Sequence, residues 1–337
     1  MRSAAVGLAT GLVLMASLAA AAGTPAFDLQ GHRGARGLAP ENTLAAFADA
    51  LSIGVTTLEL DVGVSRDGVV VVSHNRRLSA NITRDGSGSW LREPPPALFS
   101  LSLAEIATYD VGRIDPASRY AQRFADQKPR DGSRMPTLAA VFALAERAGN
   151  RDVRFNIETK TSPLEADLTL PPEAFVEAVL AVVRANRMES RVTIQSFDWR
   201  TLRIVQARAP GMVTSYLSAQ QRWLDNIRAG EAGPSPWTAG LDVDDHGGNV
   251  AALVVAAGGR VWSPFHREVD GAKIKDAHDR GLAVKVWTVN DEDRMNQLID
   301  LGVDGIITDY PDRLRRVLAA RGIDLPPPTP VQPSAPE

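Results

Sequence analysis

The 337-residue sequence contains no cysteine, and this absence excludes several features at once. Disulfide bonds cannot form, and no cysteine follows the N-terminal apolar segment to carry a lipid anchor. The thiolate ligands of a typical structural zinc site are also missing. A domain of this size can nevertheless be stable without disulfides, because it is large enough to bury a sizeable core.

Long blocks of like charge are missing as well. Lys and Arg together number 37 and Asp and Glu number 40, which gives a net charge of −3. Proteins that bind nucleic acids usually carry a basic stripe or patch. The balanced charge therefore argues against nonspecific binding of polyanions.

Only the N-terminus departs from the globular pattern. Arg2 precedes a segment of apolar or small residues over 4–20, and Ala20-Ala21-Ala22 provides the small residues of a signal-peptidase site. The segment is rich in Ala and Gly and is shorter than the ~20 residues of a usual membrane span. We therefore expect residues 1–22 to be a cleaved export signal and the mature protein to be periplasmic or secreted. An N-terminal membrane anchor is the alternative.

Short β-branched segments alternate with amphipathic ones along the rest of the chain, which is typical of βα units and a parallel sheet. The expected strands are 27–31, 56–61, 69–73, 153–158, 192–196, 212–217, 260–264, 283–288 and 304–308. The expected helices are 41–52, 137–148, 172–187, 198–208, 270–280, 291–301 and 311–320. This α/β pattern predicts a TIM-type (β/α)8 barrel over residues 23–325, with one of the nine strands accessory.

The barrel is expected to be irregular after its second strand. Too few residues separate 56–61 from 69–73 for a helical crossover, so we expect 62–66 to run back as extended chain and 69–73 to return to the barrel mouth. Residues 76–135, rich in Gly, Pro, Ser and Arg, form an insertion that we expect to be a flap over the mouth. The Pro-rich residues 326–337 are expected to be a disordered or extended tail.

Residues able to do phosphodiester chemistry are grouped near the start of the chain. His32 follows the first expected strand, Glu59 and Asp61 lie at the end of the second, and His74 follows the third. Residues two apart on a strand point to the same side, so Glu59 and Asp61 can share a cation. Carboxylates are the ligands that Ca²⁺ and Mg²⁺ prefer, histidine transfers protons near neutral pH and arginine, here Arg33, binds phosphate.

Two further residues at a later strand end complete this group. Glu158 is a third acid at the expected barrel mouth, and three convergent acids repel one another unless a cation neutralises them. Lys160 lies two residues beyond Glu158 and so points to the same side. The residues therefore predict Glu59, Asp61 and Glu158 as ligands of one divalent cation, Ca²⁺ or alternatively Mg²⁺, with Arg33 and Lys160 as phosphate-binding residues.

A series of short motifs resembles the glycerophosphodiester phosphodiesterase family. In order along the chain, these motifs are Gly31-His32-Arg33-Gly34, Pro40-Glu41-Asn42-Thr43, Glu59-Leu60-Asp61, His74, Asn156-Ile157-Glu158-Thr159-Lys160, Gln195-Ser196-Phe197, Trp287-Thr288-Val289-Asn290, and the segment 302–309. The family usually has Asp after the second histidine, whereas this chain has Asn75, which alters a supporting hydrogen bond and not the reaction.

The resemblance implies roles for several of these residues. His32 and His74 are expected to be the catalytic base and acid, although the sequence cannot order them, and Trp287 and Gln195 are expected to contact the substrate. Glu41 is either hydrogen-bonded near His32 or a first-turn acid favoured by a helix dipole. The expected reaction is cation-dependent hydrolysis of a glycerophosphodiester to sn-glycerol 3-phosphate and an alcohol, with water or a glycerol hydroxyl as the nucleophile.

Two other functions remain open from the sequence. A phospholipase-D-type or lysophospholipid-cleaving enzyme could use the same residues with a more apolar pocket, and comparing turnover of glycerophosphocholine with that of a lysophospholipid would separate the two. A non-catalytic binding module on the same barrel would bind the substrate without turning it over. The preferred head group, the native cation and the oligomeric state are not predicted.

Overall fold

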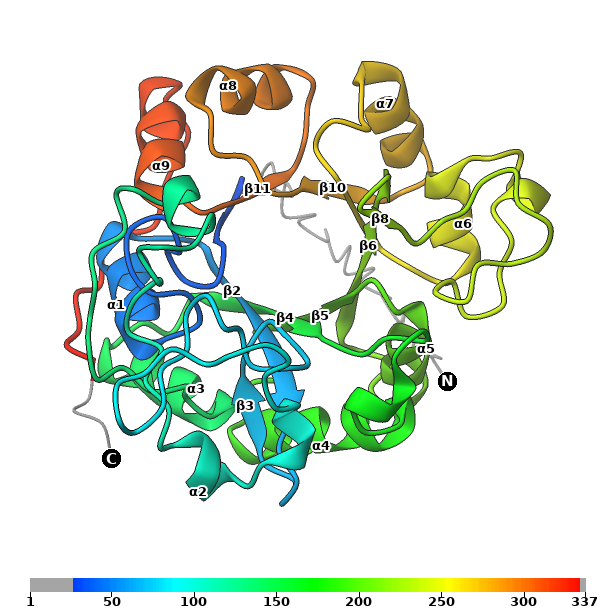
Figure 1. Cartoon of the computed structure of the whole chain (residues 1–337). Coiled ribbons are helices and arrows are strands. Elements are labelled where there is room, and N and C mark those ends of the chain that lie inside the picture. The colour runs from blue at the N-terminus through cyan, green and yellow to red at the C-terminus, as the bar shows by residue number, and fades with distance from the viewer. Residues whose placement is uncertain (1–26, 334–337) are drawn as a thin grey trace, which may run out of the picture.

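The strands of the protein close into a barrel that is surrounded by helices (Figure 1). The structure is a computed structural model that describes residues 27–333, so the expected signal segment 1–22 lies outside the described residues. Among the described residues, eight parallel strands follow the order β1-β11-β10-β9-β6-β5-β4-β2, and β1 pairs with β2 to close the ring. This confirms the predicted TIM-type fold.

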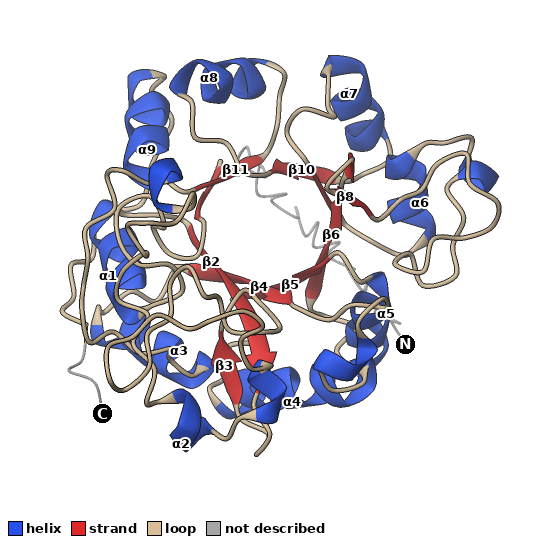
Figure 2. Ribbon diagram, in the orientation of Figure 1, coloured by secondary structure: helices blue, strands red, loops and turns tan. Residues whose placement is uncertain are grey.

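Figure 2 shows the strands as an inner ring and the helices as an outer one. The strands are β1 (Asp28–Gly31), β2 (Thr57–Val64), β3 (Val70–Val72), β4 (Arg154–Thr159), β5 (Val192–Ser196), β6 (Val213–Ser218), β7 (Gln220–Gln221), β8 (Leu224–Asp225), β9 (Val261–Pro264), β10 (Ala283–Val286) and β11 (Gly305–Thr308). The helices are α1 (Leu44–Ile53), α2 (Leu103–Ile106), α3 (Leu138–Arg147), α4 (Pro172–Ala185), α5 (Trp199–Arg208), α6 (Val250–Ala256), α7 (Gly271–Asp279), α8 (Glu292–Asp300) and α9 (Pro311–Ala320).

All seven expected helices are present, and their caps follow from local sequence. Asp198 and Asp291 accept hydrogen bonds from the first turns of α5 and α8, as their positions before these helices predict. Helix α1 begins at Leu44, with Thr43 as its N-cap, and not at residue 41. The short helix α6 was not predicted, because residues 250–256 are almost uniformly apolar and lack helical periodicity.

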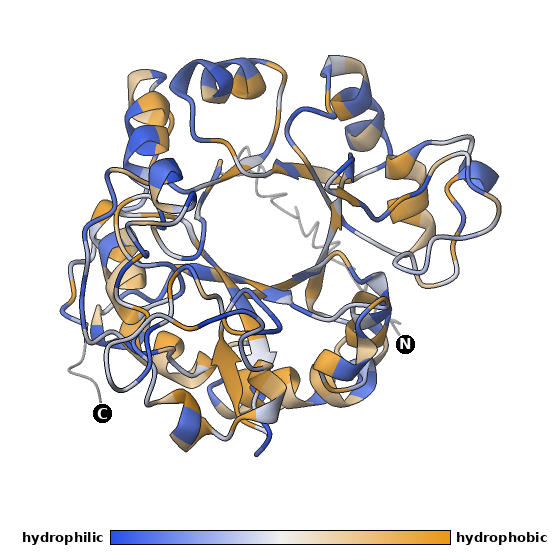
Figure 3. Cartoon of the chain, in the orientation of Figure 1, coloured by the Kyte–Doolittle hydropathy of each residue, from blue (hydrophilic) through white to orange (hydrophobic). Residues whose placement is uncertain are grey.

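Alternation along the barrel strands separates a polar interior from an apolar outer layer. On β2, Thr57, Glu59 and Asp61 alternate with Leu58 and Leu60, and the leucines belong to the main hydrophobic core. In Figure 3 hydrophobic residues are frequent in the strands and in helices such as α1 and α6, whereas α8 is largely hydrophilic. The barrel therefore packs its helices through one set of strand residues and builds its site from the other.

The barrel interior contains a buried ion pair between β1 and β10. Lys285 Nζ lies 2.5 Å from Asp28 Oδ2, and the hydroxyls of Thr56 and Thr57 donate to Asp28 Oδ1. Burial acts to raise the pKa of Asp28, but Lys285 outweighs it and lowers the pKa to about 2. Gln30 also donates to this carboxylate at 2.9 Å, so a polar network begins at Asp28 and continues toward the barrel mouth.

The path after β2 differs from the prediction. Residues 62–64 do not turn back but continue β2 to Val64, and the chain reverses only in the turn at Ser65–Gly68. Strand β3 then runs antiparallel to β2, with Val62 opposite Val72. Strand β1 pairs only with Thr57 and Leu58, which leaves the far end of β2 free to pair with β3. An accessory strand was predicted, but its predicted direction, parallel to β2 after a descending segment 62–66, was wrong.

The insertion between β3 and α3 shares a small second hydrophobic core with β3. Val71, Leu78, Leu98 and Ile106 belong to this second cluster. Residues from the start of the insertion and from around residue 120, including Arg76 and Tyr120, line the cavity described below. The insertion is therefore a packed wall of that cavity.

The Pro-rich segment is not freely solvated along its described part. Thr329 donates its backbone N–H to Leu51 O at 2.9 Å, Arg315 donates to Pro326 O at 2.9 Å, and Val331 packs against the main core. Residues 326–331 are thus held against the barrel outside any helix or strand. Within residues 27–333, every helix is too short or too polar to cross a membrane.

Candidate functional site

A cavity of about 1020 Å³ opens at the carboxyl ends of the barrel strands, where barrel enzymes have their active sites. It brings together residues that are far apart in the sequence. The sequence-predicted residues that line it are His32, Arg33, Glu41, Glu59, His74, Glu158, Lys160, Gln195 and Trp287. Asp61, the remaining predicted residue, lies behind them against Glu59 and Glu158.

Three buried carboxylates converge at this mouth. Glu59 and Asp61 alternate on β2, and Asp61 lies opposite Glu158 in the register of β2 and β4. One oxygen of each acid lies within 4.8 Å of the others. Burial and the charge of Asp61 raise the pKa of Glu158 to about 7 despite the nearby Lys160, and the pKa of Glu59 is raised well above its usual value, mainly by burial and then by Asp61.

These acids fit a hard divalent cation. Asp61 Oδ1 is buried and has no hydrogen-bond partner, and Lys160 Nζ lies 3.7 Å from it. A buried carboxylate oxygen without a partner is costly, and a bound cation would satisfy it. The same cation would relieve the repulsion among the three acids. This group of acids could therefore hold one divalent cation, as predicted.

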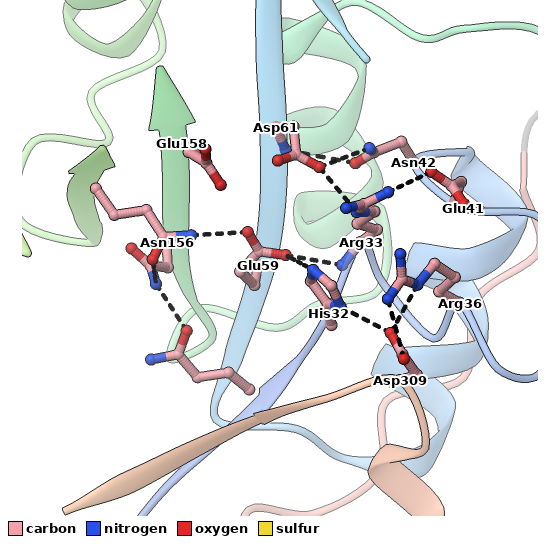
Figure 4. Close-up of polar contacts among 12 residues, drawn as sticks. His32, Arg33, Arg36, Glu41, Asn42, Glu59, Asp61, Asn156, Glu158 and Asp309 are labelled. Carbon is pink, nitrogen blue, oxygen red and sulfur yellow. Dashed lines mark hydrogen bonds and ion pairs between the residues drawn. The ribbon is translucent and has the colours of Figure 1, made fainter. Parts of the chain in front are cut away.

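His32 is oriented by a buried carboxylate on the far side of its ring (Figure 4). Its Nδ1 lies 2.7 Å from Asp309 Oδ1, and its Nε2 faces the acid cluster, 3.9 Å from Glu59 Oε2. Because a carboxylate only accepts hydrogen bonds, Nδ1 carries the proton and Nε2 has a free lone pair. Burial, followed by Arg36, lowers the pKa of His32 to about 4 although Asp309 acts in the opposite direction.

Both carboxylate oxygens of Asp309 accept hydrogen bonds. Arg36 donates to both of its oxygens, through Nε at 2.7 Å and Nη2 at 3.0 Å, and Asn290 Nδ2 donates to Oδ2 at 2.7 Å. None of these three residues was assigned a role from the sequence. Asp309 and Asn290 do belong to the motifs quoted above, and their positions just after β11 and β10 place them at the barrel mouth, which was the available signal.

His74 reaches the cavity because β3 returns toward the mouth. Its Nδ1 donates to Asn75 Oδ1 at 2.5 Å, so asparagine supplies the supporting hydrogen bond at the position where aspartate was expected. Burial lowers the pKa of His74 well below its usual value, and Arg33 and Lys160 act in the same direction. These shifts favour the neutral form of both histidines near neutral pH.

Arg33 lies in a tight turn that aims its backbone and its side chain at acids of the site. Its φ of 51° is left-handed, and its N–H donates to Glu59 Oε2 at 2.9 Å. The turn needs glycine at Gly31, because a Cβ there would lie 2.2 Å from Gly34 O. The guanidinium of Arg33 contacts Glu41 at 2.5 Å and Asp61 at 3.2 Å.

Glu41 and the insertion are linked through this arginine. Since α1 begins at Leu44, Glu41 precedes the helix, and the alternative of a first-turn acid is wrong. Glu41 accepts hydrogen bonds from Arg33 and from the hydroxyl of Tyr120, a residue of the insertion. Tyr120 was not predicted as a site residue, because nothing in the local sequence of the insertion distinguishes it.

Lys160, the second predicted phosphate-binding residue, contacts Glu158 at 2.6 Å.

Gln195 and Trp287 occupy different surroundings. Gln195 Nε2 donates to Glu59 Oε1 at 2.7 Å while its oxygen accepts from Asn156 at 2.8 Å, so its amide is held within the barrel network. Trp287 donates its indole N–H to Ser263 O at 2.9 Å and packs edge-to-face on Phe197, with ring centroids 5.2 Å apart. Trp287 thus presents a fixed aromatic surface to the cavity.

A barrel with a buried acid cluster, two oriented imidazoles and two cationic side chains at its mouth has the features of a hydrolase for phosphate esters. The sequence profile of the glycerophosphoryl diester phosphodiesterase family matches residues 32–313, and the chain belongs to this family of enzymes. A glycerophosphodiester phosphodiesterase from Caldanaerobacter subterraneus subsp. tengcongensis is 27% identical over 291 residues, which are 86% of this chain and 97% of that protein.

Two solved structures extend the comparison. A protein assigned as a glycerophosphoryl diester phosphodiesterase from Silicibacter pomeroyi is 37% identical, with a TM-score of 0.78 over 90% of this chain and 97% of that one. A phosphodiesterase from Oleispira antarctica, solved in complex with sn-glycerol 3-phosphate, is 21% identical, with a TM-score of 0.64 over 87% and 97% of the two chains. The similarity to the O. antarctica structure shows that the two proteins share a fold.

Proposed function

We propose that the protein hydrolyses glycerophosphodiesters to sn-glycerol 3-phosphate and a free alcohol with the help of one divalent cation. The observation that carries this proposal is the single cavity lined by two histidines, two cationic side chains and the acid cluster. Family membership supports the reaction, and the O. antarctica relative binds the product expected here.

Glu59, Asp61 and Glu158 would hold the cation, which we propose to be Ca²⁺ with Mg²⁺ as the alternative, since all three ligands are carboxylates. A cation bound there polarises a phosphoryl oxygen and stabilises charge in the transition state. Arg33 and Lys160 lie beside this centre and would bind the other phosphoryl oxygens. Trp287 would pack against the substrate.

His32 is proposed as the base, because its Nε2 is unprotonated and faces the centre. His74 is proposed as the acid that protonates the leaving alcohol. Burial lowers the pKa of His74, and Arg33 and Lys160 lower it further. An anionic diester bound against these two cations would offset their effect and favour protonation of His74.

Export of the protein is also proposed. Residues 1–22 would be the signal segment, residues 23–325 the barrel domain with the insertion at about 76–135, and residues 326–337 the Pro-rich end of the chain. The support is the apolar N-terminal segment and its small residues before the first strand. N-terminal sequencing of the protein recovered from its native compartment would locate the cleavage point.

The proposed reaction is tested by the release of glycerol 3-phosphate from several glycerophosphodiesters. We expect turnover with Ca²⁺ or Mg²⁺, a loss of at least about 100-fold with a chelator, and recovery when the cation is restored, because the metal would stabilise transition-state charge. Turnover that persists in the chelator would contradict the role of the cation. Binding of the diester without product would contradict catalysis.

Replacing Gln195 by leucine is expected to weaken cation binding by about 10–100-fold, the usual effect of losing a residue that orients a metal ligand. The variant removes the hydrogen bond that fixes Glu59 Oε1. Isothermal titration calorimetry with Ca²⁺ measures this change directly. Gln206→Leu is the matched control, because Gln206 bonds to Tyr216 and Gly258 outside the cavity. Equal affinities of the two variants would show that Gln195 does not position Glu59.

A further inference from the structure

The middle of the barrel is filled by polar side chains. The strand pairings place Gln30, Asn156, Ser215 and Lys285 at one level of the closed ring, on alternate strands and facing inward. Their neighbours along the strands, such as Ile157, belong to the outer core. The interior layers of such barrels usually consist of Val, Ile and Leu. A buried polar layer is stable only when its groups are hydrogen-bonded, so its hydrogen bonds show what it supports.

Three side-chain amides in a row connect this layer to Glu59 at the barrel mouth. Gln30 Nε2 donates to Asp28 Oδ2 at 2.9 Å. Asn156 Nδ2 donates to Gln30 Oε1 and to Gln195 Oε1, both at 2.8 Å. Gln195 Nε2 then donates to Glu59 Oε1 at 2.7 Å, and Figure 4 shows Asn156 in this part of the site. We refer to Gln30, Asn156 and Gln195 as the amide bridge.

The two ends of the amide bridge determine the direction of every bond in it. Asp28 is an ionised acceptor, because Lys285 lowers its pKa to about 2 against the effect of burial, and Glu59 is an acceptor when it ligates a cation. A row of amides between two acceptors must contain one amide that donates in both directions. Asn156 is that amide. Both hydrogens of its Nδ2 are used, and its Oδ1 is buried without a partner among the described residues.

The unpartnered oxygen indicates that Asn156 does more than fill space. A buried carbonyl oxygen without a donor is destabilising, and a hydrophobic side chain at this position would avoid that cost. Among uncharged side chains, however, only an amide nitrogen offers two hydrogens. Asparagine at position 156 can therefore hold Gln30 and Gln195 from between them, which a leucine or a serine cannot do.

We propose that Asn156 is a positioning residue for the cation site, which acts by holding the amide of Gln195 with its nitrogen toward Glu59. This inference rests on the proposed function, because it takes Glu59 as a cation ligand. A carboxylate oxygen has two lone pairs, so the bond from Gln195 leaves one on Glu59 Oε1 for the cation. The ion pair of Asp28 and Lys285 anchors the other end of the amide bridge. A ligand that is already fixed binds without the entropic cost of ordering it.

Asn156→Leu tests this role, because leucine has nearly the same volume and donates to neither glutamine. Losing a residue bonded to a metal ligand usually weakens metal binding 10–100-fold, and Asn156 is one hydrogen bond further away. We expect the dissociation constant of Ca²⁺, measured by calorimetry, to rise about 3–10-fold. Asn150→Leu is the matched control, because Asn150 is also buried and donates to Thr329 at 3.0 Å but does not line the cavity. Its dissociation constant should equal that of the unaltered protein.

A double-mutant cycle separates positioning through Gln195 from a general distortion of β4, which also carries Glu158. If Asn156 acts through Gln195, the double variant Asn156→Leu/Gln195→Leu should bind Ca²⁺ as Gln195→Leu does, within about 1.5-fold. A distortion of β4 would instead multiply the two losses. If Asn156→Leu does not fold, Gln30→Met takes its place, since it keeps the volume and removes the acceptor on the other side of Asn156. A loss of about threefold that disappears in the Gln195→Leu background is then expected.

Two results would overturn the inference and leave the proposed function in place. One is a dissociation constant of Asn156→Leu that equals that of Asn150→Leu. The other is a pair of losses that multiply in the double variant. With Gln30→Met in place of Asn156→Leu, the same two results have the same meaning. Failure of the unaltered protein to bind Ca²⁺ or Mg²⁺ would overturn the proposed cation site and this inference together.

Discussion

Replacing Asp309 by asparagine is expected to lower kcat by about 10²–10⁴-fold, the usual contribution of a general acid or base, with a much smaller change in KM. Both Asp309 oxygens accept hydrogen bonds, Oδ1 from His32 and Arg36, and Oδ2 from Arg36 and Asn290. An amide nitrogen at either position faces a donor. When it faces His32, it donates to Nδ1 and moves the ring proton to Nε2, the atom that has to accept a proton.

A spectroscopic measurement distinguishes this effect from a purely structural one. The chain has five histidines, so ¹⁵N-labelled imidazole signals can be assigned and the tautomer of His32 read directly. We expect Nδ1–H in the unaltered protein and Nε2–H in Asp309→Asn. The unfolding free energy should also fall, by about 3 kcal/mol, because Arg36 loses its buried anionic partner.

Asp304→Asn is the matched control for Asp309→Asn. Asp304 Oδ2 lies 2.9 Å from His278 Nε2, which makes a second Asp–His pair, but this one is half-exposed on the outside of the barrel. Its kcat should stay within about twofold of the unaltered value. An unchanged His32 tautomer in Asp309→Asn, or an equal loss of kcat in both variants, would contradict a positioning role for Asp309.

The barrel was predictable because local patterns and tertiary packing agree. Segments such as 153–158 and 192–196 are short and separated by one amphipathic helix, and each became the expected strand within a residue or two. The predicted path between β2 and β3 was wrong, because it was inferred only from the number of residues that separate the two strands. The short connection between β2 and β3 correctly excluded a helix, but it could not show that β2 extends to Val64, because that depends on where β1 stops pairing.

The site was predictable to the extent that its residues follow strand ends in sequence. His32, Glu59 and Glu158 meet because parallel strands bring their carboxyl ends to one mouth. Contacts between the mouth and distant loops were not predictable in this way. Tyr120 reaches Glu41 from an irregular insertion, and Asp309 reaches His32 only because the barrel closes between β1 and β11.

Asp61→Asn is expected to abolish cation binding and to lower kcat/KM at least about 10³-fold. Asp61 Oδ2 is occupied by Asn42 at 2.9 Å and Arg33 at 3.2 Å, so only Oδ1 is available to a cation, and it lacks any hydrogen-bond partner. In the variant, Asn42 and Arg33 still need an acceptor, so the amide oxygen takes the Oδ2 position. The NH₂ group then points at the cation centre, where it cannot act as a ligand.

Cation binding is measured apart from turnover by thermal unfolding and calorimetry. A ligand at 100 times its dissociation constant stabilises the folded protein by about 2.7 kcal/mol, so Ca²⁺ should raise the melting temperature of the unaltered protein and leave that of Asp61→Asn unchanged. Asp198→Asn is the matched control, because Asp198 is equally buried but caps α5 outside the cavity. It should keep the shift induced by Ca²⁺. A calcium shift that survives in Asp61→Asn would place the cation elsewhere, because Asp61 Oδ1 is the buried acid oxygen of this cluster that has no hydrogen-bond partner.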